Sequence, residues 1–339
     1  MLRRTLVFIT MISGTFSLAA AQQDACKSVE IPVGVVNFSG ESFRGLAPQD
    51  FLAHAQKGSI AVKSITYDNG PRRVLLVVDT NKKLSANLRK VEVELVKTLV
   101  AAARPEDSLG LLPARGPGAV VKFGDPRSGL VDAIQDTSAH QGKDRGVLDA
   151  VQDGIEWFSD PHPGDAIIVV AADTEGNHKA NAKSVAKALA EHHIRMFGLA
   201  LGPIQTRNST TSSFYTSTTS QGLSLAQPST GDLIYNTGDE DFYPLTSNSG
   251  GLVMMVADPD SKQFSDNMSD PQVQQRVKAR AVIVTNAVEA FYRAVVEPQR
   301  VPSPGWWSLD LTESIRKNSP KMWLLYPNQL GSCSEMASK

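Results

Sequence analysis

The chain has 339 residues, of which 41% are apolar and 20% charged, and its formal net charge is −1 at pH 7. This length allows one large domain and a smaller one. The near-zero charge gives no electrostatic basis for binding nucleic acid or an anionic membrane. No apolar span of about 18 residues follows the N-terminal segment, so no integral membrane segment is predicted.

Residues 1–21 are predicted to be a signal peptide. Two arginines precede the apolar stretch 6–18, and alanines 19–21 supply the small residues of a cleavage site. The mature protein is then expected to be secreted or to lie in the periplasm or cell envelope. Cys26 and Cys333, near the two ends of the mature chain, are expected to form a disulfide in such an oxidising compartment. The alternatives are free or differently paired thiols, or a lipid anchor at Cys26.

Residues 22–70 are predicted to form a small N-terminal β segment. The stretches 31–38 and 60–65 have the composition of short strands, and the residues between them contain glycine turns without a helical period.

Two uninterrupted apolar runs organise the centre of the chain. The first, 74–78, ends at Asp79, and the second, 166–172, ends at Asp173. Runs without alternation are typical of strands buried on both faces of a parallel sheet. Because ligands of such sheets bind beyond the carboxyl ends of the strands, we expect Asp79 and Asp173 to mark a site at one edge.

Helices and further strands alternate along residues 71–257. The periodicity predicts helices over 84–104, 128–135, 146–158 and around Val185, and strands over 108–112, 119–123 and 194–200. This alternation predicts an α/β fold: a doubly wound, mostly parallel sheet flanked by helices, related to the Rossmann fold.

Three further segments complete the prediction. The Ser/Thr-rich segment 206–237 is predicted to be an exposed loop near the same sheet edge. Residues 258–339 are predicted to be a C-terminal helical extension, with a helix over 273–296, followed by a tail. The tryptophans of that tail are expected to pack in a core.

The order of these segments resembles a von Willebrand factor type A domain, of the variety found in exported proteins of acidobacteria. The likeness covers about residues 31–256. It rests on the strands that end in aspartate and on four further segments, which are the valines of 33–36, the Gly-Leu-x-x-x-Asp-Phe motif of 45–51, the helix start 146–151 and the Gly-Gly segment 242–251. The resemblance implies a metal-ion-dependent adhesion site built from Asp-x-Ser-x-Ser, a threonine and a second aspartate around Mg²⁺.

This sequence departs from that pattern at the ligand positions. Asp79 and Asp173 are kept, and Asn81 replaces the first serine, but Lys83 stands at the second serine and Arg145 at the threonine. Neither Lys nor Arg offers an acceptor to a cation. We therefore predict a site without metal or other cofactor, in which Lys83 or Arg145 pairs with the two aspartates. The alternative is weak metal binding through Asp79, Asn81 and Asp173.

No catalytic motif accompanies the predicted fold. The sequence contains no Gly-x-Ser-x-Gly elbow, His-Glu-x-x-His or phosphate-binding glycine loop. The predicted function is thus an exported, non-enzymatic adhesion or scaffold module that binds an unidentified protein or cell-surface ligand. The alternatives are a weakly Mg²⁺-dependent adhesion domain, a hydrolytic enzyme at the same sheet edge, or a structural domain whose former site is a salt-bridge cluster.

Overall fold

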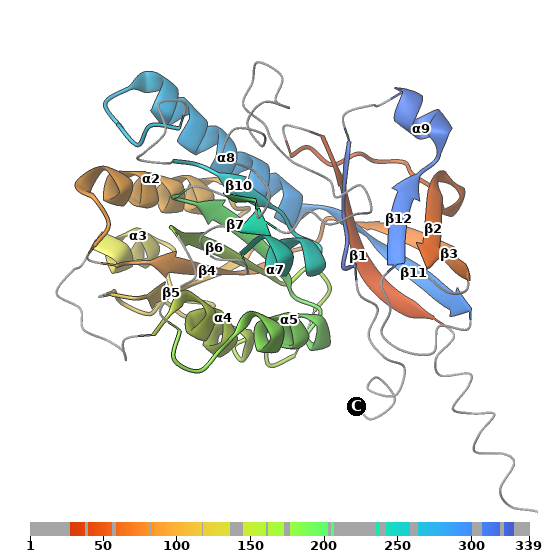
Figure 1. Ribbon diagram of the computed structural model, residues 1–339, viewed down its shortest axis with the longest axis horizontal. Coiled ribbons are helices and arrows are strands. Elements are labelled where there is room, and N and C mark those ends of the chain that lie inside the picture. Colours follow the sequence, from red (N-terminus) through yellow and green to blue (C-terminus); the bar gives the residue numbers. More distant parts are fainter. Residues whose placement is uncertain are drawn as a thin grey trace, which may run out of the picture.

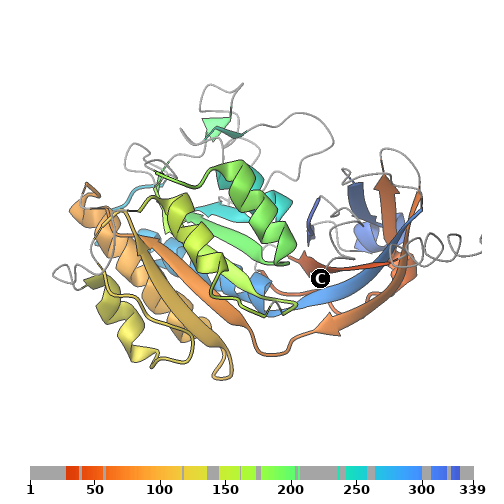
Figure 2. The ribbon, with the colours of Figure 1, turned by 90° about the horizontal axis from the view of Figure 1, so that it is seen from below.

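The protein is described by a computed structural model with two sheets lying side by side along its long axis (Figures 1 and 2). The described residues are 28–37, 40–55, 59–81, 83–116, 118–135, 145–160, 162–172, 177–202, 205–206, 235–236, 242–257, 264–299, 307–318 and 322–328. The predicted signal peptide, Cys26, Cys333, Asp173 and most of the Ser/Thr-rich segment lie outside these residues. The short strands β8 (Gln205–Thr206) and β9 (Tyr235–Asn236) pair at the ends of that segment.

A five-stranded parallel sheet with helices on both faces forms the larger part of the molecule, which confirms the predicted fold class. Its strands are all joined by parallel pairings. In spatial order they are β10 (Val253–Met255), β7 (Arg195–Ala200), β6 (Ala166–Ala171), β4 (Arg73–Asp79) and β5 (Ser108–Ala114).

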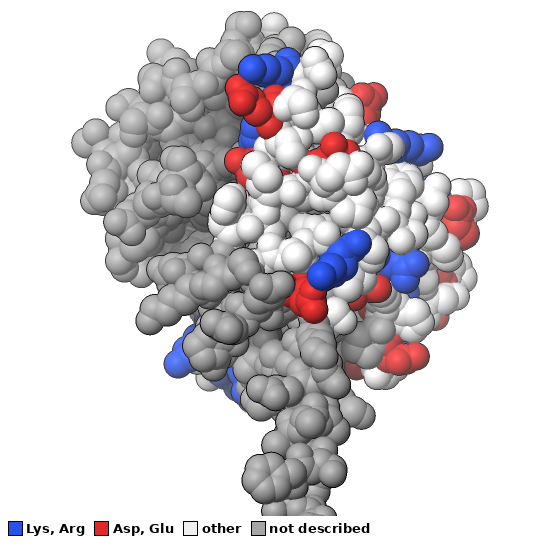
Figure 3. Space-filling model, turned by 90° about the vertical axis from the view of Figure 1, so that its right-hand side faces the viewer, with Lys and Arg blue, Asp and Glu red and all other residues white. Residues whose placement is uncertain are grey.

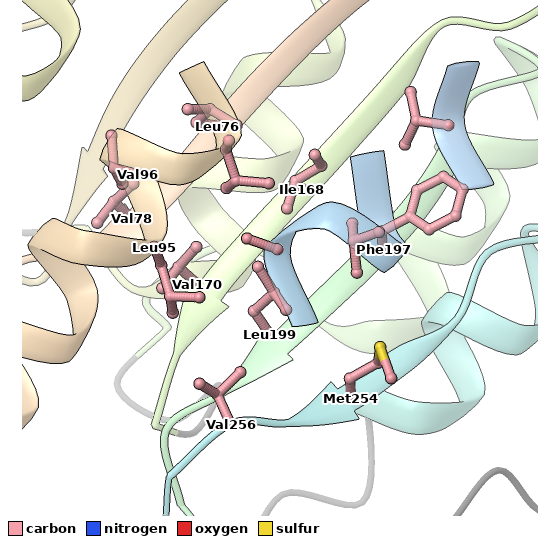
Figure 4. Packing of buried hydrophobic residues seen from close by; sticks show 14 of the residues in the cluster. Leu76, Val78, Leu95, Val96, Ile168, Val170, Phe197, Leu199, Met254 and Val256 are labelled. Atoms are coloured by element: carbon pink, nitrogen blue, oxygen red, sulfur yellow. The ribbon is translucent and has the colours of Figure 1, made fainter. Parts of the chain in front are cut away.

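Helices cover both faces of this sheet because successive strand residues point to opposite sides. Leu76 and Val78 face one core cluster, and Leu75 and Val77 face the other. The first cluster, part of which is shown in Figure 4, packs under α2 (Ala86–Ala102), α3 (Ser128–Gln135) and α8 (Pro271–Glu289). The second packs under α4 (Val147–Ile155), α5 (Ala182–Glu191) and α7 (Phe242–Asn248). Within the described residues, no helix has the length and apolar character needed to cross a membrane.

The second sheet is antiparallel and is built from both ends of the chain. Its order is β12 (Trp307–Leu311), β2 (Phe51–Ala55), β3 (Ser59–Asp68), β11 (Phe291–Gln299), β1 (Val29–Val36) and β13 (Trp323–Leu325). A one-turn 3-10 helix (Pro48–Asp50) precedes β2, and α9 (Glu313–Asn318) follows β12. The N-terminal β segment and the C-terminal tail, which the sequence analysis treats separately, thus share one core.

Two predicted boundaries differ from the structure. The helix predicted over 273–296 ends at Glu289, and β11 follows. In β11 the buried residues Tyr292, Ala294 and Val296 alternate with less buried ones, which is a strand period rather than a helical one. The strand predicted over 119–123 is reduced to a single bridge between Val121 and Leu111.

Two arginines fix the junction between the sheets at the C-terminus of α8. Arg195 is completely buried and donates to the carbonyls of Ala287 (3.2 Å) and Val288 (2.8 Å), while Arg72 Nε donates to that of Glu289 (3.1 Å). Both guanidinium groups stack on the ring of Phe291, with Cζ 4.5 Å (Arg72) and 4.4 Å (Arg195) from the ring centroid. These two side chains donate to the last carbonyls of α8, which have no partner within the helix. Burial lowers the pKa of Arg195 to about 9.

Candidate functional site

Asp79 is the last residue of β4 and its side chain is completely buried. Both carboxylate oxygens are engaged by Arg115, whose Nε donates to Oδ1 at 3.0 Å and whose Nη2 donates to Oδ2. The backbone N–H of Asn81 adds a third hydrogen bond to Oδ1, at 3.2 Å. A guanidinium that donates to both oxygens of a carboxylate is among the strongest ion pairs in proteins.

The register of β4 and β5 places Arg115 beside Asp79. Asp79 pairs with Ala114, and the pairing continues through Thr80, whose N–H donates to the Ala114 carbonyl at 2.8 Å. Arg115 then adopts a left-handed conformation, with φ of 54°. At Gly116 a Cβ atom would lie 2.0 Å from the Thr80 carbonyl oxygen, so only glycine allows the backbone after β5 to lie this close to the backbone after β4.

Arg115, and not Lys83 or Arg145, is the described partner of Asp79, so the predicted pairing of those two cations with Asp79 is wrong. Their predicted pairing with Asp173 stays a prediction. Lys83 is exposed, and its backbone N–H donates to Asn81 Oδ1 at 3.0 Å in a local turn. Arg145 forms an ion pair with Asp153 of α4, with Nη1 and Oδ2 3.1 Å apart. Arg115 pairs with Asp79 because it directly follows β5, the strand whose last residue, Ala114, lies beside Asp79. Lys83 lies beyond the turn after Asp79 and is exposed to solvent. Asp173 lies outside the described residues.

Arg115 was missed in the sequence analysis, because the basic residues of the site were sought only at the positions that correspond to the adhesion-site pattern. A signal for it exists in the sequence. Arg115 is the first charged residue after the apolar strand 108–114, and the ends of parallel strands meet at one edge.

A buried glutamate lies next to this ion pair, on α2. Glu92 is fully buried, and its Oε2 accepts a hydrogen bond from Arg89 Nη1 at 2.8 Å, while its Oε1 has no hydrogen-bond partner among the described residues. Burial raises the pKa of Glu92 to about 8; Arg89 opposes this shift, and the negative charge of Asp79 adds to it. Arg89 also donates to the carbonyls of Thr80 (3.2 Å) and Asn81 (2.7 Å), so it ties the loop after Asp79 to Glu92.

Asp149 holds the segment after β6 against the start of α4. Its carboxylate accepts backbone N–H bonds from Gly146 (3.2 Å), His178 (2.7 Å), Lys179 (2.9 Å) and Ala180 (2.7 Å). Burial alone would raise the pKa of Asp149, but these hydrogen bonds to the charged form lower it below the usual value. Residues 178–180 are thereby fixed to the start of α4.

Replacing Asp149 with Asn is expected to lower the free energy of unfolding by about 1–3 kcal/mol. The amide has one acceptor oxygen and no charge, so it cannot satisfy the same set of backbone donors. Urea unfolding of Asp149→Asn measures the loss. Asp153→Asn is the matched control on the same helix, since Asp153 is largely exposed. An equal loss in both variants would contradict this role of Asp149.

The described residues of this edge do not fit a divalent cation. Both oxygens of Asp79 are held by Arg115, and the Asn81 amide oxygen accepts the Lys83 N–H. Mg²⁺ needs several oxygen ligands in near-octahedral geometry, which Lys83 and Arg145 cannot supply. Across the described part of the chain, no three His, Cys, Asp or Glu side chains are grouped so that they could hold a metal ion.

Comparison with protein-family models and with curated proteins found no match. Among solved structures, the chain is similar to a von Willebrand factor type A protein from Catenulispora acidiphila, with 9% identity, a TM-score of 0.43, and coverage of 83% of this chain and 73% of that one.

Two bacterial structures that cover a smaller share of this chain are also similar. One is the conserved hypothetical protein BatB from Bacteroides thetaiotaomicron, with 19% identity, a TM-score of 0.37, and coverage of 62% of this chain and 99% of that one. The other is an aerotolerance-related membrane protein from Bacteroides fragilis, with 16% identity, a TM-score of 0.38, and coverage of 61% of this chain and 98% of that one. These similarities concern the fold alone and give no residue of this chain a role.

Proposed function

We propose that this chain is an exported, non-enzymatic protein-interaction module of the von Willebrand A type, which acts in adhesion or as a scaffold without a metal ion. Its partner is a protein or a cell-surface ligand. The observation that carries the proposal is the engagement of both Asp79 oxygens by Arg115.

This ion pair supports metal independence on electrostatic grounds. A divalent cation at Asp79 would have to displace the Arg115 guanidinium from a fully buried carboxylate. A displaced guanidinium beside a bound cation would add repulsion between like charges. The exposed ammonium of Lys83 lies on the loop after Asp79, where it is available to pair with a carboxylate of the partner directly.

The same groups support a non-enzymatic role. Asp79 is paired with a permanent cation and is inaccessible to solvent, so it is unsuited to act as a base or a nucleophile. Glu92 has a pKa near the range useful for acid–base chemistry, but its side chain is completely buried, which is unfavourable for contact with a substrate.

Capture of the partner from the native envelope fraction tests this proposal. Immobilised protein is expected to retain the same partner, within about twofold, in millimolar Mg²⁺ and in excess EDTA. The variant Lys83→Glu is expected to retain several-fold less, because it reverses a charge on the binding loop.

The other outcomes point to the alternative functions. Retention that is lost in EDTA and restored by Mg²⁺ would favour a metal-dependent adhesion domain. A turnover that is found in a substrate screen and abolished by Asp79→Asn would favour an enzyme.

A further inference from the structure

A groove of about 540 Å³ lies along the outer side of α2, between the end of α3 and the residues that precede α8. We call it the α2 groove. Its lining combines apolar side chains with basic ones, namely Arg89, Lys90, Val93, Glu94, Lys97, Ile134, Gln135 and Met268. Its volume is within the range of small binding sites.

The α2 groove has a positively charged rim. Lys90, Val93 and Lys97 follow one another at spacings of three and four residues, so they lie on one face of the helix. Both lysines are exposed, and neither forms an ion pair within the described residues. The single acid of the lining, Glu94, pairs with Lys278 of α8 at 3.6 Å, so its charge is balanced from outside the groove.

This distribution differs from that on the opposite end of the molecule. Figure 3 shows the face of the antiparallel sheet, where the acidic and basic side chains of the described residues are interspersed. The α2 groove instead presents two exposed lysines, Lys90 and Lys97, beside apolar side chains, while its arginine, Arg89, is paired with Glu92. Its charge is complementary to an acidic ligand.

Arg89 connects the α2 groove to the loop after Asp79. Its side chain lines the groove and also donates to the carbonyls of Thr80 and Asn81. The groove therefore lies next to the loop on which we place partner binding, with the Arg89 side chain between them. A bound segment of a partner could contact both.

We propose that the α2 groove binds an acidic peptide segment of the protein partner, one that carries at least one large apolar side chain. This inference rests on the proposed function, which supplies the protein partner. Carboxylates of the segment pair with Lys90 and Lys97, and its apolar side chain packs on the partly exposed Val93 and Met268. Exposed ion pairs contribute little each, so the apolar contact supplies much of the affinity.

Fluorescence anisotropy with two labelled synthetic peptides tests the inference. One peptide contains only Glu and Leu, and the other has every Glu replaced by Lys. The Glu peptide is expected to bind at least about tenfold more tightly than the Lys peptide, and the double variant Lys90→Glu/Lys97→Glu is expected to weaken its binding about tenfold. Val93→Ser is expected to weaken it several-fold, because the variant removes an apolar contact.

The matched control is Lys183→Glu/Lys187→Glu, which makes the same charge change on the exposed side of α5, a helix of the opposite layer. It is expected to change binding of the Glu peptide by less than about twofold. The inference is overturned if this control weakens binding as much as the groove variant does. It is also overturned if the two peptides bind equally well.

The captured partner separates this inference from the proposed function. If Lys90→Glu/Lys97→Glu leaves the captured partner bound while Lys83→Glu releases it, the α2 groove inference fails and the interaction module stands. If no protein is retained under any condition, the proposed function fails, and the groove inference fails with it. Loss of the partner in both variants supports both.

Discussion

Replacing Arg115 with Ala is expected to lower the free energy of unfolding by about 3–5 kcal/mol, because it leaves a buried charge without its counter-ion. Asp79 is completely buried, and Arg115 supplies two of the three hydrogen bonds described for its carboxylate. The one remaining hydrogen bond, from the N–H of Asn81, does not compensate for the cost of removing a charged carboxylate from water. Urea denaturation of Arg115→Ala measures the loss.

Two further variants make this expectation specific. Arg145→Ala removes a nearby arginine whose partner, Asp153, is largely exposed, and it is expected to cost less than about 1 kcal/mol. Adding Asp79→Asn to Arg115→Ala is expected to recover a large part of the stability, since it removes the unpaired charge. If the double variant loses the sum of the two single losses, Asp79 and Arg115 are not energetically coupled, and the ion pair has no special role.

The stability of the protein is expected to fall between pH 5 and pH 8 because of Glu92. The folded-state pKa of about 8 lies above the usual 4.5, so the folded protein holds this proton more tightly than the unfolded chain does. The contribution of Glu92 is therefore fully present below pH 4.5 and is lost as the pH rises to about 8. The slope is about 1.4 kcal/mol per pH unit at most, or on the order of 5 kcal/mol in all.

Comparison with Glu92→Gln isolates this contribution from the other titrating groups. Gln resembles the protonated carboxyl in size and carries no charge, so the variant is expected to lose the pH dependence that Glu92 causes. Unfolding free energies of both proteins at several pH values from 5 to 9 provide the test. If the difference between wild type and variant does not change with pH, Glu92 does not titrate in this range.

The parallel sheet could be predicted from local sequence patterns, whereas the antiparallel sheet could not. The runs that end at Asp79 and Ala172 are apolar on both faces, and this pattern has few interpretations other than a buried parallel strand. The antiparallel sheet depends on pairs such as Val33 and Tyr292, which lie at opposite ends of the chain. No local pattern specifies which distant strands pair, so the N-terminal and C-terminal segments remained separate in the prediction.

The candidate site could be predicted only in part, because it also depends on how strands pair. Asp79 is visible as the acid that ends a buried strand, but the role of Arg115 depends on strand register and on a left-handed backbone conformation. Neither can be read from the residue types alone. Glu92 had a detectable signal, since it lies four residues after Leu88 and three before Leu95, on the apolar stripe of a predicted helix.

We propose that Arg115 provides the positive charge at Asp79 that a bound ion provides in a metal-dependent adhesion site. A crystal structure of the protein grown in millimolar Mn²⁺, with anomalous data collected at the manganese edge, tests it directly. The expected result is Arg115 in contact with both oxygens of Asp79 and no anomalous peak beside them. An anomalous peak coordinated by Asp79, with Arg115 turned away, would contradict the account.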